Sequence, residues 1–232
     1  MAFVFLAFVA FMFVLFLFLL PILYSLQAVG SLFVYPRQLK AMFGNKILRR
    51  NHALEHATIV VMMERQPGRR FNGFSTDDGF FVQGVRSLDE VDSAAREALR
   101  RIKNGERHLA IHRNCGTTIV AANLLAAIFF LGSLGVGLYL GLSLGNLFLL
   151  VVGAMLLSFV LRVPLSLLLQ RFVTTEQDLT NAEVGWVEAA KPHEMRGGIL
   201  GVLLAASTAQ VRVFHTDPDM VEILRDDGAV VK

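Results

Sequence analysis

Two long stretches of the chain contain no Asp, Glu, Lys or Arg, and they constrain its fold more than any other feature. One covers residues 1–36 and the other covers residues 114–161. A helix needs about 20 apolar residues to cross the hydrocarbon core of a bilayer, and both stretches are longer than that. Only 18% of all residues are charged, whereas soluble domains carry about 25%. We therefore predict an integral membrane protein.

These stretches predict about three transmembrane helices. The first stretch predicts one helix over residues 3–26 with a kink at Pro21, and the second predicts a helical hairpin over residues 117–139 and 142–169. The first stretch lacks the basic start and the small-residue cleavage pattern of a signal peptide, so we expect it to be retained. Glycines allow paired membrane helices to approach closely. The candidates in the hairpin are Gly132, Gly135, Gly137 and Gly141.

Basic residues beside these stretches predict the orientation. Residues 37–50 include basic side chains and no acidic one, which favours the cytoplasmic side of a membrane. Arg162 and Arg171, at the far end of the hairpin, agree with a return to that side. We therefore expect the N-terminus outside, with the polar domain and the C-terminus in the cytoplasm. The alternative is that residues 37–50 form a solvated basic face without topological meaning.

The charge pattern divides the chain into four parts. These are an N-terminal transmembrane helix (1–36), a basic linker with a small α+β domain (37–117), a transmembrane hairpin (118–170) and a C-terminal tail domain (171–232). In the tail we expect a helix over residues 176–190 and an apolar core or interfacial element over residues 199–206. The predicted fold class is an α-helical membrane protein with about three transmembrane helices and a small α+β cytoplasmic domain.

Capping and turn residues predict the elements of the small domain. A helix over residues 52–65, capped by Asn51, precedes a β-hairpin that turns at residues 77–79. A capping box begins a second helix after Ser87. Residues 108–112, with the sequence HLAIH, are then expected to form a strand.

The first helix of this domain carries the sequence HALEH, residues 52–56. Positions i, i+3 and i+4 share one helix face, so His52, Glu55 and His56 project together. Two imidazoles at this spacing can ligate one zinc ion, and a neighbouring carboxylate can take a proton from a bound water. The order H-x-x-E-H is similar to that of the inverted zincins. We therefore predict a zinc site with Glu55 as the candidate catalytic base.

A zinc site requires more ligands than these two histidines. Peptidases with this motif use a glutamate well downstream, and here no acidic residue lies between Glu106 and Glu176, so that ligand is missing. His108 and His112 share a face if HLAIH is a strand. Cys115 offers a thiol, which is a ligand suited to zinc. We predict His112 as the third ligand, with Cys115 or His108 completing the site.

Each of these residues also has an ordinary structural explanation. The two helix histidines can be solvated, the two in HLAIH can lie on a strand edge, and Cys115 can be a small packed residue. In a closed four-ligand site, Glu55 would orient a histidine instead of acting as a base.

Three segments in order, NHALEHATI, GFSTDDGFFVQG and LAIHRNCGT, precede the hairpin. Together they resemble an uncharacterised family of bacterial integral membrane proteins, a domain of unknown function that is frequent in photosynthetic lineages. The resemblance covers roughly residues 50–120. It implies a bacterial inner or photosynthetic membrane and brings no activity or substrate.

Three hypotheses for function follow, and whether the protein is an enzyme stays open. The first is a membrane-anchored zinc metallohydrolase of peptidase type. The second is a non-catalytic metal site that stabilises the small domain. The third is an accessory subunit of a larger photosynthetic or bioenergetic complex, with histidines that bind a tetrapyrrole. Expected partners are the lipid bilayer and a membrane complex or a second copy. Nucleic acid is not expected, because no basic and aromatic stripe is present.

Overall fold

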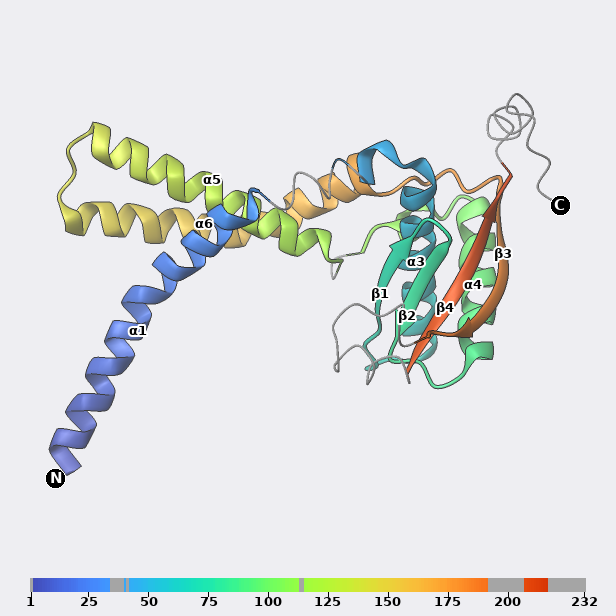
Figure 1. Cartoon of the computed structure of the whole chain (residues 1–232), viewed down its shortest axis with the longest axis horizontal. Helices are drawn as coiled ribbons and strands as arrows, with labels where there is room; N and C mark the ends of the chain where they lie inside the picture. The colour runs from blue at the N-terminus through green and yellow to red at the C-terminus, as the bar shows by residue number, and fades with distance from the viewer. Residues whose placement is uncertain (1, 34–39, 41, 113–114, 192–206, 217–232) are drawn as a thin grey trace. The chain divides into compact units, whose positions relative to one another are not determined.

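The computed structural model describes residues 2–33, 40, 42–112, 115–191 and 207–216, which belong to two compact units (Figure 1). The first unit contains Met1–Ala41 and Arg113–Leu169, and the second contains Met42–His112 and Gln170–Lys232. Each unit therefore combines two separate segments of the chain. The apolar element expected at residues 199–206 lies outside the described residues.

The helices described in the first unit are strongly apolar. They are α1 (Ala2–Ser31), α5 (Thr117–Tyr139) and α6 (Leu144–Leu169). Two segments, Thr117–Tyr139 and Leu144–Thr174, are long and apolar enough to cross a membrane. They correspond to the predicted hairpin. Helix α1 has 30 residues, and the apolar segment found among its described residues is Val4–Phe16. The third transmembrane helix and the orientation therefore stay predictions.

Small side chains mark the contacts between these three helices. Ala28 of α1 is fully buried together with Ala126 and Ala127 of α5, which allows the two helices to lie close together. Between α5 and α6, a Cβ on Gly137 would collide with the side chain of Leu147. The other glycines predicted at this contact face open space, so Gly137 carries the close approach within the hairpin.

A four-stranded antiparallel sheet with two helices on one face forms the second unit (Figure 1). Its elements are α3 (Lys46–Arg65), β1 (Asn72–Thr76), β2 (Gly79–Gln83), α4 (Leu88–Lys103), β3 (Ala182–Ala189) and β4 (Thr208–His215). The strand order is β1-β2-β4-β3. Helix α3 packs on β1 and β2, and α4 packs on β3. The core between the layers includes Leu54 of α3, Phe80 of β2, Val91 of α4 and Val211 of β4.

The β-hairpin and the second helix of this unit confirm the sequence predictions. Strands β1 and β2 pair in register around Asp77 and Asp78, with Thr76 opposite Gly79. Ser87 caps α4, because its hydroxyl accepts a hydrogen bond from the Asp89 N–H at 3.2 Å. These features could be predicted because turns and caps depend on neighbouring residues alone.

The segment after residue 170 differs from its prediction. The helix predicted over residues 176–190 is wrong, since this region forms β3, which pairs with β4. Ala182 and Val184 of β3 point into the core, whereas Glu183 is exposed, as expected for a period of two. The described part of the predicted tail domain, residues 171–232, therefore completes the sheet of the small domain instead of folding apart from it.

Two local predictions in the first half of this unit are also corrected. HLAIH does not form a strand: residues Arg107–Ala110 form a 3-10 turn, η1, whose Leu109 and Ala110 are buried. Helix α3 begins at Lys46, six residues earlier than predicted, because Asn45 is its cap and accepts from the Leu48 N–H at 3.0 Å. Asn51 is fully buried in the middle of the helix.

Asn51 ties α3 to the hairpin and to the last described strand. Its amide nitrogen donates to the carbonyl oxygens of Thr76 and Asp77, at 2.8 Å and 3.1 Å. Its amide oxygen lies 2.7 Å from Nε2 of His215. This one side chain therefore joins the start of the sheet to its final strand.

Replacing Asn51 by Ala should lower the free energy of unfolding by about 1–3 kcal/mol, because buried partners lose their hydrogen bonds. Chemical denaturation of the detergent-solubilised chain measures the change. Asn72→Ala, on the exposed side of β1, is the control and should change stability by less than about 0.5 kcal/mol. An equal effect of both substitutions would contradict the assigned role of Asn51.

Candidate metal site

His52, Glu55 and His56 lie on one buried face of α3. Their exposed fractions are 6%, 4% and 2%. The alternative of a solvated helix face is therefore wrong. Polar groups are buried only when partners compensate for the lost water, so the partners of these three side chains define what the site can do.

Each of the two imidazoles is held through its Nδ1 atom by a backbone carbonyl. Nδ1 of His52 lies 2.9 Å from the oxygen of Thr174, and Nδ1 of His56 lies 2.8 Å from that of Ala110. A carbonyl oxygen only accepts, so each Nδ1 carries the proton and each Nε2 keeps its lone pair. Histidines that bind metals use this same arrangement.

The lone pair on Nε2 of His56 is not satisfied by any described residue. Its Nε2 atom is buried and has no hydrogen-bond partner among the described residues. The ring of His52 lies beside it, with the two centroids 4.3 Å apart and the planes inclined by 61°. Leaving a buried acceptor without a partner costs about 1–3 kcal/mol. A cation bound at Nε2 would remove this cost.

Burial keeps His56 neutral. Desolvation lowers its pKa well below the ordinary 6.5, and the neighbouring His52 and His112 lower it further, while the hydrogen bond to Ala110 opposes the shift. The pKa of His112 is also lowered by burial. At neutral pH the imidazole of His56 is therefore uncharged, which is the form that binds metals.

Glu55 lies against strand β1. The hydroxyl of Ser75 donates to its Oε2 atom. A Cβ on Gly73 would stand 2.6 Å from Oε1 of Glu55 and 2.8 Å from the carbonyl oxygen of Phe81, so the carboxylate occupies the space that a side chain would need. Sequence reasoning missed both Gly73 and Ser75. A glycine inside a predicted strand was the available signal, because it indicates close approach of another group.

Of the predicted completing ligands in the second unit, His112 lies near the pair and His108 does not join it. The ring centroids of His56 and His112 are 6.2 Å apart. The backbone N–H of His112 donates to Oε1 of the buried Gln170 at 2.8 Å, which holds this residue in place. His108 is exposed on the η1 turn. The two histidines were expected on one face only because HLAIH was expected to be a strand.

The predicted ligands His52, His56 and Cys115 do not all lie in one unit. The two histidines are in the second unit, whereas Cys115 stands in the first, three residues after His112. Its sulfur lies 3.2 Å from the hydroxyl of Thr117. Three residues of extended chain span at most about 11 Å, so covalent connection alone keeps the thiol close to His112.

Comparisons with known proteins bring a family and no activity. The family described as "Domain of unknown function (DUF6391)" matches residues 47–187. An uncharacterised protein of Picosynechococcus sp. is 36% identical over 89 residues, which cover 34% of this chain and 43% of that protein. The match therefore spans less than half of that relative. No solved structure matches this chain.

The lowered pKa of His56 predicts a stability that declines in mild acid. Below about pH 6.5, the His56 side chain is protonated in the unfolded chain but stays neutral in the folded one, because its folded pKa is lowered. The free energy of unfolding therefore decreases as the pH is lowered from 6.5 to the folded pKa. The slope from this group is at most about 1.4 kcal/mol per pH unit, and it vanishes above 6.5. Denaturant titrations from pH 8 to pH 4.5 with a chelator present measure it.

His56→Asn is the matched variant for this titration. The Asn amide keeps a donor for the Ala110 carbonyl but has no group that titrates in this range. The variant should be less stable throughout and should lose part of the slope between pH 6.5 and pH 4.5. A slope identical to that of the wild type would contradict the role given to His56.

Proposed function

This chain belongs to the DUF6391 family of domains of unknown function, and from its own residues we propose that it is a membrane-anchored metal-binding protein whose site is built on His52 and His56. The apolar helices α5 and α6 would serve as the anchor, since both are long enough to cross a bilayer. The second unit would carry the metal ion.

One observation carries the proposal: Nε2 of His56 is a buried imidazole nitrogen that has no hydrogen-bond partner among the described residues, and it lies beside a second imidazole. Both rings are held in the tautomer whose proton is on Nδ1, so the lone pair of Nε2 can coordinate a metal ion. A buried structural histidine would be expected to use both nitrogens, since buried polar atoms are nearly always hydrogen-bonded. The arrangement therefore supports a ligand pair more than a pair of packing residues.

The donor types favour zinc. Imidazole and thiolate ligands suit Zn²⁺, which usually takes four ligands in structural sites. Within our proposal His112 is the third ligand, because its ring centroid lies 6.2 Å from that of His56. Cys115, three residues further along the chain, stays the ligand predicted from the sequence. A tetrapyrrole between the two rings is disfavoured, since centroids 4.3 Å apart leave no room for a flat macrocycle.

A zinc hydrolase is the second candidate function, and Glu55 favours it. The carboxylate is on the same helix face as the two histidines and is held by Ser75. A zinc ion with an open coordination position activates water for hydrolysis, and Glu55 would then accept the proton. A closed site with four protein ligands would leave Glu55 with an orienting role only.

The metal site is tested by elemental analysis of the full chain purified in detergent and loaded with Zn²⁺. We expect about one zinc per chain in the wild type and a strong loss in His56→Asn, which removes the Nε2 donor but keeps a group for Ala110. His108→Asn, at an exposed histidine, is the control and should retain the metal. Zinc absent from the wild type, or retained equally by both variants, would refute the proposal.

Glu55→Gln separates a catalytic from a non-catalytic site. The amide keeps the size of the side chain and can still accept from Ser75, so zinc content should be unchanged. If the protein is a hydrolase, cleavage of an unstructured protein such as casein should fall by about 100-fold or more. Unchanged cleavage, or no cleavage by the zinc-loaded wild type, would leave a non-catalytic metal site as the function.

A further inference from the structure

Arg162 is a basic residue inside the apolar helix α6, and it has no part in the proposed metal site. It is the only Asp, Glu, Lys or Arg in the sequence of this helix, Leu144–Leu169. A charged side chain within a membrane helix is costly, and such residues are found where a partner compensates for their charge. If α6 crosses a membrane, Arg162 therefore requires a partner.

The register of the α5–α6 hairpin places Arg162 close to the end opposite the turn. The Thr118 hydroxyl of α5 lies 2.8 Å from the hydroxyl of Ser166, which follows Arg162 by one turn of α6. At the other end, Tyr139 is 90% exposed, as is typical of aromatic side chains at a membrane interface. The helical rise puts Arg162 about 27 Å along the axis from Leu144. Since the hydrocarbon core is about 30 Å thick, a turn at one interface places Arg162 near the other.

An aromatic ring holds the guanidinium of Arg162. Its Cζ atom lies 3.8 Å from the centroid of the Phe159 ring, which is a cation–π contact. Phe159 is itself 61% exposed, so the pair lies at the outer surface of α6. Within the part of the chain that the structure describes, the buried Nε atom of Arg162 has no hydrogen-bond partner. The ring attracts the cation but leaves its N–H donors, five in a guanidinium, without an oxygen acceptor.

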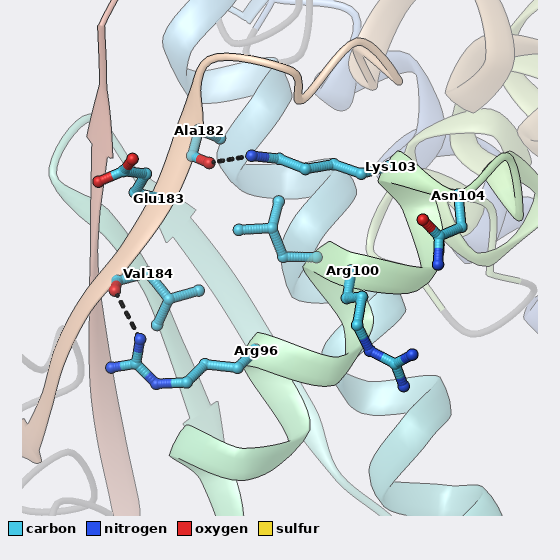
Figure 2. Close-up of a pocket in the computed structure, with 8 residues that line it drawn as sticks. Arg96, Arg100, Lys103, Asn104, Ala182, Glu183 and Val184 are labelled. Atoms are coloured by element: carbon cyan, nitrogen blue, oxygen red, sulfur yellow. Dashed lines mark hydrogen bonds between the residues drawn. The ribbon is translucent and has the colours of Figure 1, made fainter.

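Arg96 of the second unit shows how protein groups satisfy an arginine of this chain. It donates to the carbonyls of Val184 and Gly185 at 3.1 Å and 2.8 Å, and it forms an ion pair with Asp92 at 2.9 Å. Figure 2 shows its side chain crossing from α4 to the Val184 carbonyl. Arg96 thus has both acceptors and a countercharge, which Arg162 lacks among the described residues.

The sequence of the first unit offers no carboxylate to Arg162. Residues 1–41 and 113–169 contain no Asp or Glu, but they contain four basic residues, Arg37, Lys40, Arg113 and Arg162. The positive charge of this unit is therefore not compensated from within it. A lipid phosphate lies at the membrane interface, carries negative charge and can accept two N–H bonds from one guanidinium.

We propose that Arg162 binds the phosphate of an anionic phospholipid, with an acyl chain of that lipid lying along α6. Leu156, Phe159 and Val160 share one face of the helix, are exposed, and lie between Arg162 and the turn, so they would contact the chain. The uncompensated charge of the unit favours an anionic headgroup over a zwitterionic one. This inference rests on the proposed function of α5 and α6 as a membrane anchor, and it names the lipid class that the anchor binds.

The full chain is reconstituted into nanodiscs that contain equal amounts of phosphatidylcholine and phosphatidylglycerol. A chelator is present, so the result does not depend on the metal site. After release into mild detergent, native mass spectrometry counts the lipids that stay bound, and we expect phosphatidylglycerol to be retained over phosphatidylcholine. Excess inorganic phosphate should not displace it, because phosphate lacks the acyl chain. Displacement by phosphate would assign a site for a free anion and overturn the lipid proposal.

Arg162→Gln should lower the retention of phosphatidylglycerol about 10-fold, because the charge-assisted hydrogen bonds to the phosphate are lost. Arg162→Lys keeps the charge and should keep part of the lipid preference, which separates lipid binding from a general effect on folding. Arg86→Gln, at an exposed residue of the second unit, is the control with the same change of charge and should retain lipid as the wild type does.

Equal retention of both lipids by the wild type, or an equal loss in Arg162→Gln and Arg86→Gln, would overturn the role given to Arg162 and leave the anchor in place. Failure of the wild-type chain to co-elute with the nanodiscs would instead refute the anchor, and this inference with it.

Discussion

The carbonyl groups of Ala110 and Thr174 hold the two imidazoles of α3, and much of the second unit depends on these two hydrogen bonds. Ala110 lies just before the chain leaves this unit, and Thr174 lies just after it returns. Gln170 joins the same two segments directly through the His112 N–H. Helix α3 thus gathers both ends of the long apolar insertion on one polar face.

This arrangement explains how a small domain tolerates so many buried polar groups. His52, Glu55 and His56 replace water by a carbonyl, a hydroxyl and a second carbonyl from three different segments. Such a network stabilises only the arrangement in which every segment is in place. Nε2 of His56 is not satisfied in this way: like Oγ1 of Thr174, it is buried and has no hydrogen-bond partner among the described residues. An unsatisfied atom inside an otherwise well-paired network is the reason for assigning a ligand to this position.

The electrostatics of the proposed metal site favour a bound cation. Around His56, burial and neighbouring histidines favour the neutral form, which suits a bound cation. Helix α3, which carries this site, packs on β1 and β2, while α4 packs on β3. The family to which the chain belongs has no assigned function, so the proposed role rests on these local properties alone.

The sequence by itself determined the features that depend on neighbouring residues. The apolar hairpin, the turn at Asp77, the cap at Ser87 and the shared face of His52 and His56 were all predictable, because helix and strand periodicity and turn chemistry are local. The position of the α3 cap and the nature of HLAIH were not, since several short-range signals competed there and packing decided between them. The predicted helix over residues 176–190 failed for the same reason.

Only the tertiary structure decided which distant groups meet. Thr174 lies 122 residues from His52 along the chain, and Ala110 lies 54 residues from His56. Nothing in the local sequence of HALEH encodes those partners, nor the closing of the sheet by β3 and β4, nor the contact of Glu55 with Gly73. The burial and the tautomer of His56 follow from these contacts, as does the lone pair on its Nε2 atom that no described residue satisfies. They arise when segments far apart in sequence pack together, and not from the residues beside each histidine.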